Sequence, residues 1–128
     1  MSRIVPDEVY RNVPCSIVAV GCAVGKDDTR VLANAKGLKD DGYLTLDSMN
    51  KYIRSLIPVQ KKEVFRKGER LLLRDFLRGN KRKAIVCVLG HYVYVEGESY
   101  YSFFENDSDE VVCVWWIKEE PPTEIEPF

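Results

Sequence analysis

The sequence lacks the features that would place the protein in a membrane or in an export pathway. No stretch approaches the roughly 18 uncharged apolar residues that a membrane span needs, and the first residues, Met1–Glu8, have no apolar core of the kind found in signal peptides. We therefore expect a cytoplasmic protein, in the host cytoplasm if the source is viral, with no membrane partner. In that compartment the four cysteines remain reduced thiols instead of forming a disulfide framework.

Histidine is nearly absent, because His91 is the only one in the chain. Cys-x-x-Cys motifs and histidine clusters are also missing, so the pattern offers no zinc site, and we expect no metal or other cofactor. A length of 128 residues, of which 45% are hydrophobic, is enough for one core. We expect one domain over residues 1–118. The acidic, proline-containing residues 119–128 form a tail that we expect to be disordered.

Charge is unevenly distributed although the net charge is only −1. Residues 61–83 contain ten basic and three acidic residues, whereas residues 96–128 contain ten acidic residues and one lysine. A basic patch can bind nucleic acid, but only Phe65 and Phe76 are interleaved with these arginines and lysines. Nucleic acid is therefore an unlikely partner. The basic segment 61–83 and the acidic tail remain surfaces through which the chain could contact another protein.

An apolar run beginning at Cys15 is the feature around which the chain is organised. Pro14 favours the start of a helix there, and the residues up to Val24 are apolar on every side, as in a buried central helix. The β-branched residues would also suit a strand. A cysteine in the first turn meets unpaired backbone N–H groups and the positive end of the helix dipole, which favour the reactive thiolate. The alternative is that Cys15 is a small buried hydrophobe, which is how we interpret Cys22 two turns later.

The remaining pattern predicts helices first and strands afterwards. Further helices are expected at 27–35, at 46–56 with Thr45 as N-cap, and at 68–78, with a short strand near 63–65 between the last two. Four β-rich runs follow, at 84–89, 92–95, 99–104 and 111–117. The prediction is an α+β domain in which the Cys15 helix packs on a C-terminal antiparallel sheet.

His91 opens one of these strands in the run Leu89-Gly-His-Tyr-Val-Tyr-Val95. A nucleophilic cysteine needs a general base, and imidazole is suited to that task near neutral pH. The order of a helix-start cysteine, a strand-borne histidine and a later polar residue resembles the papain-like cysteine peptidase clan. The likeness is to its smallest bacterial and phage forms, such as bacteriocin-processing peptidase domains. It covers 12–23 and 89–116 and rests elsewhere on element order alone.

The resemblance implies a papain-like fold and a catalytic triad. Cys15 is the nucleophile and His91 the base, and the third residue falls on Asn106, with Glu105 and Asp107 as alternatives. The glutamine by which the family stabilises the oxyanion would stand at Val9, so that Asn12 or a backbone N–H must serve instead. This departure leaves an inactive relative open.

Strand pairing ranks the candidates for the third residue. A two-residue turn within 96–98 places His91 opposite Ser102 or Phe104 and puts even-numbered residues, including Asn106, on its face. A three-residue turn would present Glu105 instead. The order is therefore Asn106, Glu105 and Asp107, with the alternative that all three only solvate a loop.

Two classes of function follow. The first is a cysteine hydrolase (peptidase, isopeptidase or amidase) or acyltransferase that acts on a peptide or protein substrate. The second is a catalytically inactive protein on the same scaffold, which binds or inhibits a partner through its basic segment or its acidic tail.

Overall fold

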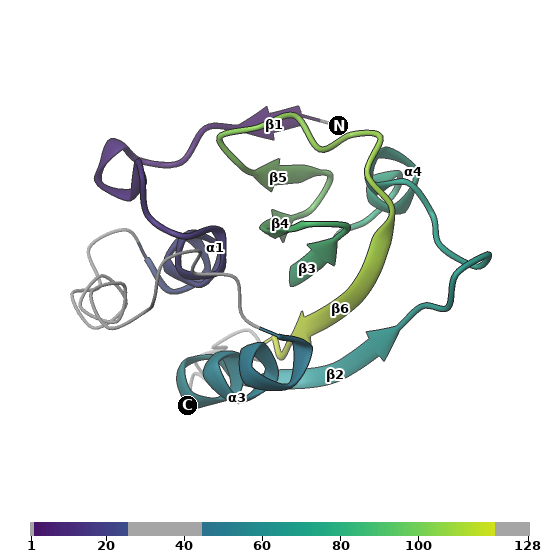
Figure 1. The fold of residues 1–128 in the computed structure, drawn as a ribbon, viewed down its shortest axis with the longest axis horizontal. Helices are drawn as coiled ribbons and strands as arrows, with labels where there is room; N and C mark the ends of the chain where they lie inside the picture. The colour runs from purple at the N-terminus through teal and green to yellow at the C-terminus, as the bar shows by residue number, and fades with distance from the viewer. Residues whose placement is uncertain (1, 26–44, 120–128) are drawn as a thin grey trace, which may run out of the picture.

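The computed structural model describes residues 2–25 and 45–119 (Figure 1). The helices are the 3-10 helix η1 (Glu8–Tyr10), α1 (Cys15–Val24), α3 (Leu46–Leu56) and α4 (Leu73–Leu77). The strands are β1 (Ser2–Ile4), β2 (Val59–Val64), β3 (Lys83–Val88), β4 (His91–Glu96), β5 (Ser99–Tyr101) and β6 (Val111–Ile117). The α+β prediction is confirmed. The helix predicted at 27–35 lies outside the described residues, as does the tail beyond residue 119.

The strands form one six-stranded sheet in the order β1-β5-β4-β3-β6-β2. Every pairing is antiparallel except that of β1, which runs parallel to β5. The prediction of a purely antiparallel sheet from the second half of the chain is therefore wrong at both edges, where β1 and β2 add strands from earlier in the sequence. The three residues of β1 are too few for a detectable hydrophobic period. They form a strand because their backbone pairs with that of β5.

Helix α1 begins where the sequence predicts. Pro14 is its N-cap and the carbonyl of Pro14 accepts hydrogen bonds from the N–H groups of Ile17 and Val18. Gly25, with a φ of 122°, ends the helix. Residues 16–21 of α1 are all buried, which explains why the sequence is apolar on every side. The alternative of a strand at these residues is wrong, because they form a helix.

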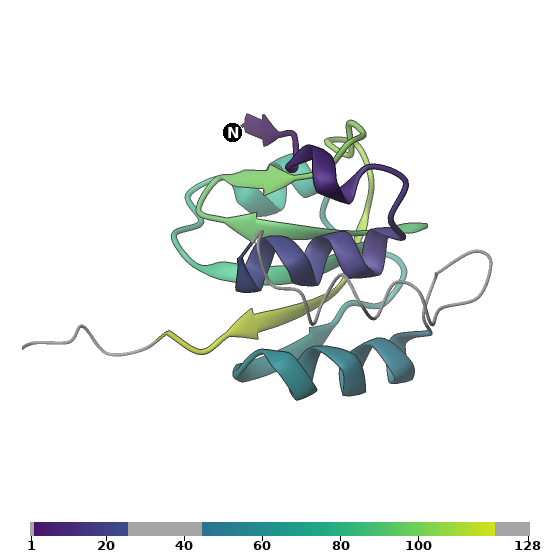
Figure 2. The ribbon, with the colours of Figure 1, turned by 90° about the vertical axis from the view of Figure 1, so that its left-hand side faces the viewer.

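Two apolar clusters cover the two faces of the sheet. Helices α1 and α3 lie on one face (Figures 1 and 2), where Ile17, Val20, Met49 and Ile53 pack against Tyr92 and Trp115. The short helix α4 lies on the other face, where Leu73 and Leu77 pack against a second set of strand residues. Because side chains alternate along a strand, β4 contributes Tyr92 and Tyr94 to the first cluster and Val93 and Val95 to the second.

The sequence predicts the bounds of α3 well and those of α4 poorly. Thr45 caps α3 as predicted, its Oγ1 accepting the N–H of Ser48 at 3.2 Å. Helix α4 covers only part of the predicted 68–78, because Leu72 forms a β-bridge with Glu110 and the carbonyl of Leu71 accepts the N–H of Val111. Pairing with the chain before β6 thus competes with the helix. Strand β2 is longer than the predicted 63–65, since it begins at Val59 along β6.

Membrane insertion by a helix finds no support in residues 2–25 and 45–119, since none of the helices there is long and apolar enough to cross a bilayer.

Candidate active site

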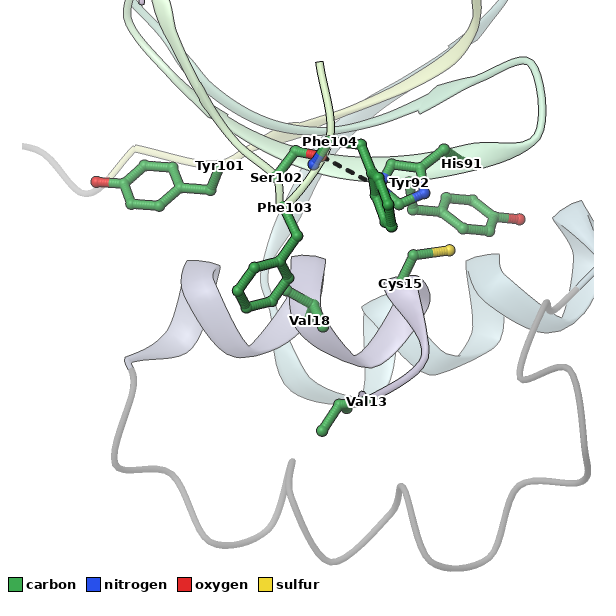
Figure 3. Close-up of a pocket in the computed structure, with 9 residues that line it drawn as sticks. All are labelled: Val13, Cys15, Val18, His91, Tyr92, Tyr101, Ser102, Phe103 and Phe104. Carbon is green, nitrogen blue, oxygen red and sulfur yellow. Dashed lines mark hydrogen bonds between the residues drawn. The ribbon is translucent and has the colours of Figure 1, made fainter. Parts of the chain in front are cut away.

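The start of α1 and the start of β4 form two walls of one pocket (Figure 3). Its volume is about 70 Å³, and it is lined by Val13, Cys15, Val18, His91, Tyr92, Tyr101, Ser102, Phe103 and Phe104. Cys15 and His91 are 76 residues apart in sequence by their numbers, and the packing of α1 on β4 brings them to the same cavity, as predicted. Figure 3 shows both side chains directed into the space between the helix and the sheet.

Cys15 is half-buried, and burial of the thiol raises its pKa above the ordinary value. The backbone N–H groups of Tyr92, Ser16 and Cys15 itself have the smaller, opposite effect on the pKa. The expectation that the helix start gives Cys15 a lowered pKa is therefore wrong. Desolvation of the thiolate outweighs the favourable effect of the backbone N–H groups.

His91 is also half-buried. Its Nε2 atom lies 3.3 Å from Oγ of Ser102, and its ring meets that of Phe104 edge to face with centroids 5.7 Å apart. Burial lowers the pKa of His91, and the negative charge of Asp109 offsets part of this effect. Burial thus disfavours the charged form of both groups, the thiolate of Cys15 and the imidazolium of His91.

The hairpin of β4 and β5 confirms the predicted register. Glu96 pairs with Ser99, so the turn has two residues, Gly97 and Glu98. The pairing ends at Tyr101, and the chain after it contacts His91 through the hydroxyl of Ser102 and the ring of Phe104. Both odd-numbered residues (Tyr101 and Phe103) and even-numbered ones (Ser102 and Phe104) line the pocket with His91.

Asn106 lies near His91 but reaches it through Ser102. Both Ser102 and Asn106 are buried, with 2% and 6% of their surfaces exposed. Ser102 Oγ donates to Oδ1 of Asn106 at 2.7 Å, and Nδ2 of Asn106 donates to Asp109 at 2.7 Å. The backbone N–H of Asn106 donates to the Tyr100 hydroxyl at 3.0 Å. The structure thus places the predicted third residue one hydroxyl group away from the imidazole.

The other predicted residues have different surroundings. Glu105 is exposed, and Asp107 accepts a hydrogen bond from the Tyr100 hydroxyl. Asn12 is exposed with a φ of 66° and is not among the residues that line the pocket. Cys22 is half-buried like Cys15, and is therefore not the fully buried hydrophobe that the sequence predicts. Burial raises the pKa of the Cys22 thiol to about 12.

Sequence reasoning missed two members of the site, Ser102 and Asp109. Strand pairing predicts Ser102 near His91, but nothing in the sequence indicates that its hydroxyl links the imidazole to Asn106. Asp109 is three positions after Asn106, and a turn closed by the Asp109 N–H and the Asn106 carbonyl at 3.0 Å brings the two side chains together. Such a turn leaves no periodic signal in the sequence.

Comparison with family models, with curated proteins and with solved structures finds no match for this chain. The geometry therefore supplies the functional evidence. Within residues 2–25 and 45–119, no three His, Cys, Asp or Glu side chains group together in a way that could hold a metal ion. What the site offers is a thiol, an imidazole and a buried polar chain behind the imidazole.

Proposed function

We propose that the protein is a papain-like cysteine hydrolase that acts on peptide or protein substrates. The observation that supports this most directly is the shared pocket of Cys15, at the start of a helix, and His91, at the start of the adjacent strand. A nucleophile and a base from separate elements that face one cavity are the minimal equipment for acyl transfer.

In the proposed reaction His91 acts as a general base, because burial disfavours a resting thiolate–imidazolium pair. His91 takes the thiol proton as the sulfur of Cys15 attacks the substrate carbonyl, and the N–H of Cys15 helps to hold the oxyanion that forms. His91 then returns the proton to the leaving amine as the C–N bond breaks. Water attacks the resulting thioester with His91 again as base, which releases the acid and restores the thiol.

The walls of the pocket indicate the kind of substrate. Val13, Val18, Phe103 and Phe104 surround the thiol with apolar surface, and Phe104 is 63% exposed. An apolar side chain beside the cleaved bond would bury surface against these residues. We therefore expect substrates with an apolar residue next to the scissile carbonyl.

A binding or inhibitory protein on the same scaffold is the competing function. Two observations favour it, the raised pKa of Cys15 and the position of Asn12 outside the pocket. A cysteine peptidase ordinarily uses a readily formed thiolate and a side chain that stabilises the oxyanion. The two functions differ in one measurable respect, namely whether His91 increases the reactivity of Cys15 toward a peptide-based electrophile.

Peptidyl vinyl sulfones test this difference, since their addition to a thiol needs a proton from a neighbouring acid. A panel with different apolar residues should label the wild-type protein on Cys15, as mass spectrometry of its peptides would show. Cys15→Ser should abolish labelling, and Cys22→Ser, the matched control on the same helix, should leave it unchanged. His91→Ala should slow labelling by about a hundredfold, the usual contribution of general acid–base catalysis.

Two outcomes would contradict the proposal. One is that no member of the panel labels Cys15 faster than it labels Cys22. The other is that His91→Ala labels at the wild-type rate while its thermal unfolding matches that of the wild type. Either result would favour the binding protein.

A further inference from the structure

A continuous chain of polar groups runs from the imidazole into the loop between β5 and β6. It consists of His91, Ser102, Asn106 and Asp109, joined by contacts of 3.3, 2.7 and 2.7 Å. Its two central members are buried, where an unsatisfied polar group is costly. The direction of each hydrogen bond can therefore be derived from the chemistry of the groups.

The derivation begins at Asp109, because an ionised carboxylate can only accept. The atom of Asn106 that faces it must therefore be the amide nitrogen, which leaves the amide oxygen toward Ser102. That oxygen accepts the single hydroxyl proton of Ser102. Ser102 Oγ is thereby left as an acceptor, and the N–H of Phe104 fills one of its acceptor positions at 3.0 Å.

The remaining acceptor position of Ser102 faces His91, so Nε2 of His91 must hold the proton. In the neutral ring this makes Nδ1 the unprotonated nitrogen. Figure 3 shows the ring with Nε2 toward Ser102 and its other nitrogen on the side of Cys15. The atom that can accept a proton is then the one nearer the thiol.

We propose that Ser102, Asn106 and Asp109 act as a positioning relay that holds His91 in the Nε2–H tautomer, with Nδ1 free to accept a proton. Asp109 accepts from the Asn106 amide nitrogen and so fixes the orientation of the amide. The Asn106 oxygen then accepts the Ser102 hydroxyl proton, which leaves Ser102 Oγ to accept from Nε2 of His91. The assignment of the tautomer depends only on the hydrogen bonds. Its use against Cys15 rests on the proposed function.

The relay explains why Asn106 is buried although it does not touch the imidazole. In this interpretation the single hydroxyl of Ser102 performs the orienting task that the family resemblance assigns to the third residue itself. Ser102, Asn106 and Asp109 are positioning residues, since they act on the reaction only through His91.

Nitrogen-15 NMR can test the tautomer directly, because His91 is the only histidine and gives a single imidazole spectrum. The full-length protein labelled with 15N-histidine is measured at about pH 8, where the neutral ring predominates. We expect Nε2 to be protonated in nearly all molecules, with its proton protected from solvent exchange. A protonated Nδ1, or a mixture of tautomers in the wild type, would overturn the relay.

Two variants probe the relay from opposite ends. Ser102→Ala removes the acceptor and should expose the Nε2 proton to exchange and give a mixture of tautomers. Asp109→Asn keeps the shape of the side chain but can donate, so the direction is no longer fixed, and a mixture is again expected. Ser108→Ala, in the same loop but exposed, is the matched control and should match the wild type. Thermal unfolding identifies any variant that fails to fold, and wild-type tautomer populations in folded Ser102→Ala would overturn the relay.

Vinyl sulfone labelling separates this inference from the proposed function. If the relay serves the base, Ser102→Ala should slow the labelling of Cys15 by about tenfold or more, because a ring in the other tautomer presents no lone pair to the thiol. The Nε2–H tautomer without any labelling of Cys15 would support the relay and contradict the enzyme. Labelling that depends on His91 with a protonated Nδ1 would contradict the relay and support the enzyme.

Discussion

Ser102 stands between His91 and Asn106, with its Oγ 3.3 Å from the imidazole Nε2 and 2.7 Å from the Asn106 amide oxygen. The orientation of the ring therefore depends on the loop that follows β5 as well as on β4 itself. The backbone of Ser102 is held in turn by β1, since its N–H donates to the carbonyl of Ile4 and its carbonyl accepts from Arg3. A change in this loop should alter the site without a change in the sheet.

The pH dependence of Cys15 alkylation should show a raised pKa. A raised pKa means that the neutral thiol persists to higher pH, so the rate of reaction with iodoacetamide should increase with a midpoint above the usual value of about 8.5. His91→Ala should leave this midpoint almost unmoved, because the lowered pKa of His91 makes the ring neutral where the thiol titrates. Rates come from mass spectrometry of the alkylated peptides.

The other cysteines provide the controls for that measurement. Cys22, whose pKa is raised to about 12, should react more slowly than Cys15, and the buried Cys87 and Cys113 should not react in the native protein. A Cys15 midpoint below about 8.5 that moves upward in His91→Ala would show instead that the pair is a thiolate and an imidazolium.

Gly21→Ala should destabilise the protein although alanine is the better helix former. A Cβ atom at position 21 would lie 2.5 Å from the Cε1 and hydroxyl atoms of Tyr10, a side chain that is only 1% exposed. We expect a loss of about 1–3 kcal/mol in the free energy of unfolding, as for other overpacked cores, against a gain of at most about 1 kcal/mol in helix propensity. Urea denaturation measures the difference.

The double variant Tyr10→Leu with Gly21→Ala tests the cause of that loss. Without the tyrosine ring the clash is absent, so the cost of Gly21→Ala should largely disappear in the Tyr10→Leu background. If the two costs simply add, the contact between Gly21 and Tyr10 is not responsible.

Thr45 should contribute measurably to stability as the N-cap of α3. Thr45→Ala removes the oxygen that accepts the Ser48 N–H and should cost about 1 kcal/mol in urea denaturation. Thr45→Ser keeps the hydroxyl and serves as the control, with stability near that of the wild type. Equal losses in the two variants would assign the effect to the lost methyl group instead.

The sequence predicts best where the signal is local. Pro14 before an apolar run marks the start of α1, Thr45 marks that of α3, and a turn at Gly97 fixes the register of the hairpin. Strand β1 and the shortened α4 escape prediction because distant backbone partners decide them. Non-local pairing of this kind has no counterpart in a hydrophobic period.

The candidate site likewise has a part that local sequence signals predict and a part that they do not. Cys15 and His91 can be singled out from the sequence because a helix start and a strand start each have a recognisable pattern, and the packing of α1 on β4 brings them together. The place of Asn106 behind Ser102, and of Asp109 behind Asn106, depends on the path of an irregular loop. The sequence predicts the wrong direction for the pKa shift of Cys15, because a helix start can be inferred from sequence, whereas the depth of burial of the thiol cannot.

Strand β1 has a consequence for how the protein is made. Arg3 reaches the carbonyl of Ser102, 99 positions later in the chain, and the pocket joins residues 13–18 to residues 91–104. Contacts this distant form slowly, and none of them can form until the ribosome has released the strand that begins at His91. Until then the growing chain carries Cys15 without His91 beside it. The nascent polypeptide exposes an ordinary thiol, and any reaction of that thiol that needs His91 is withheld until β1 and β5 have met.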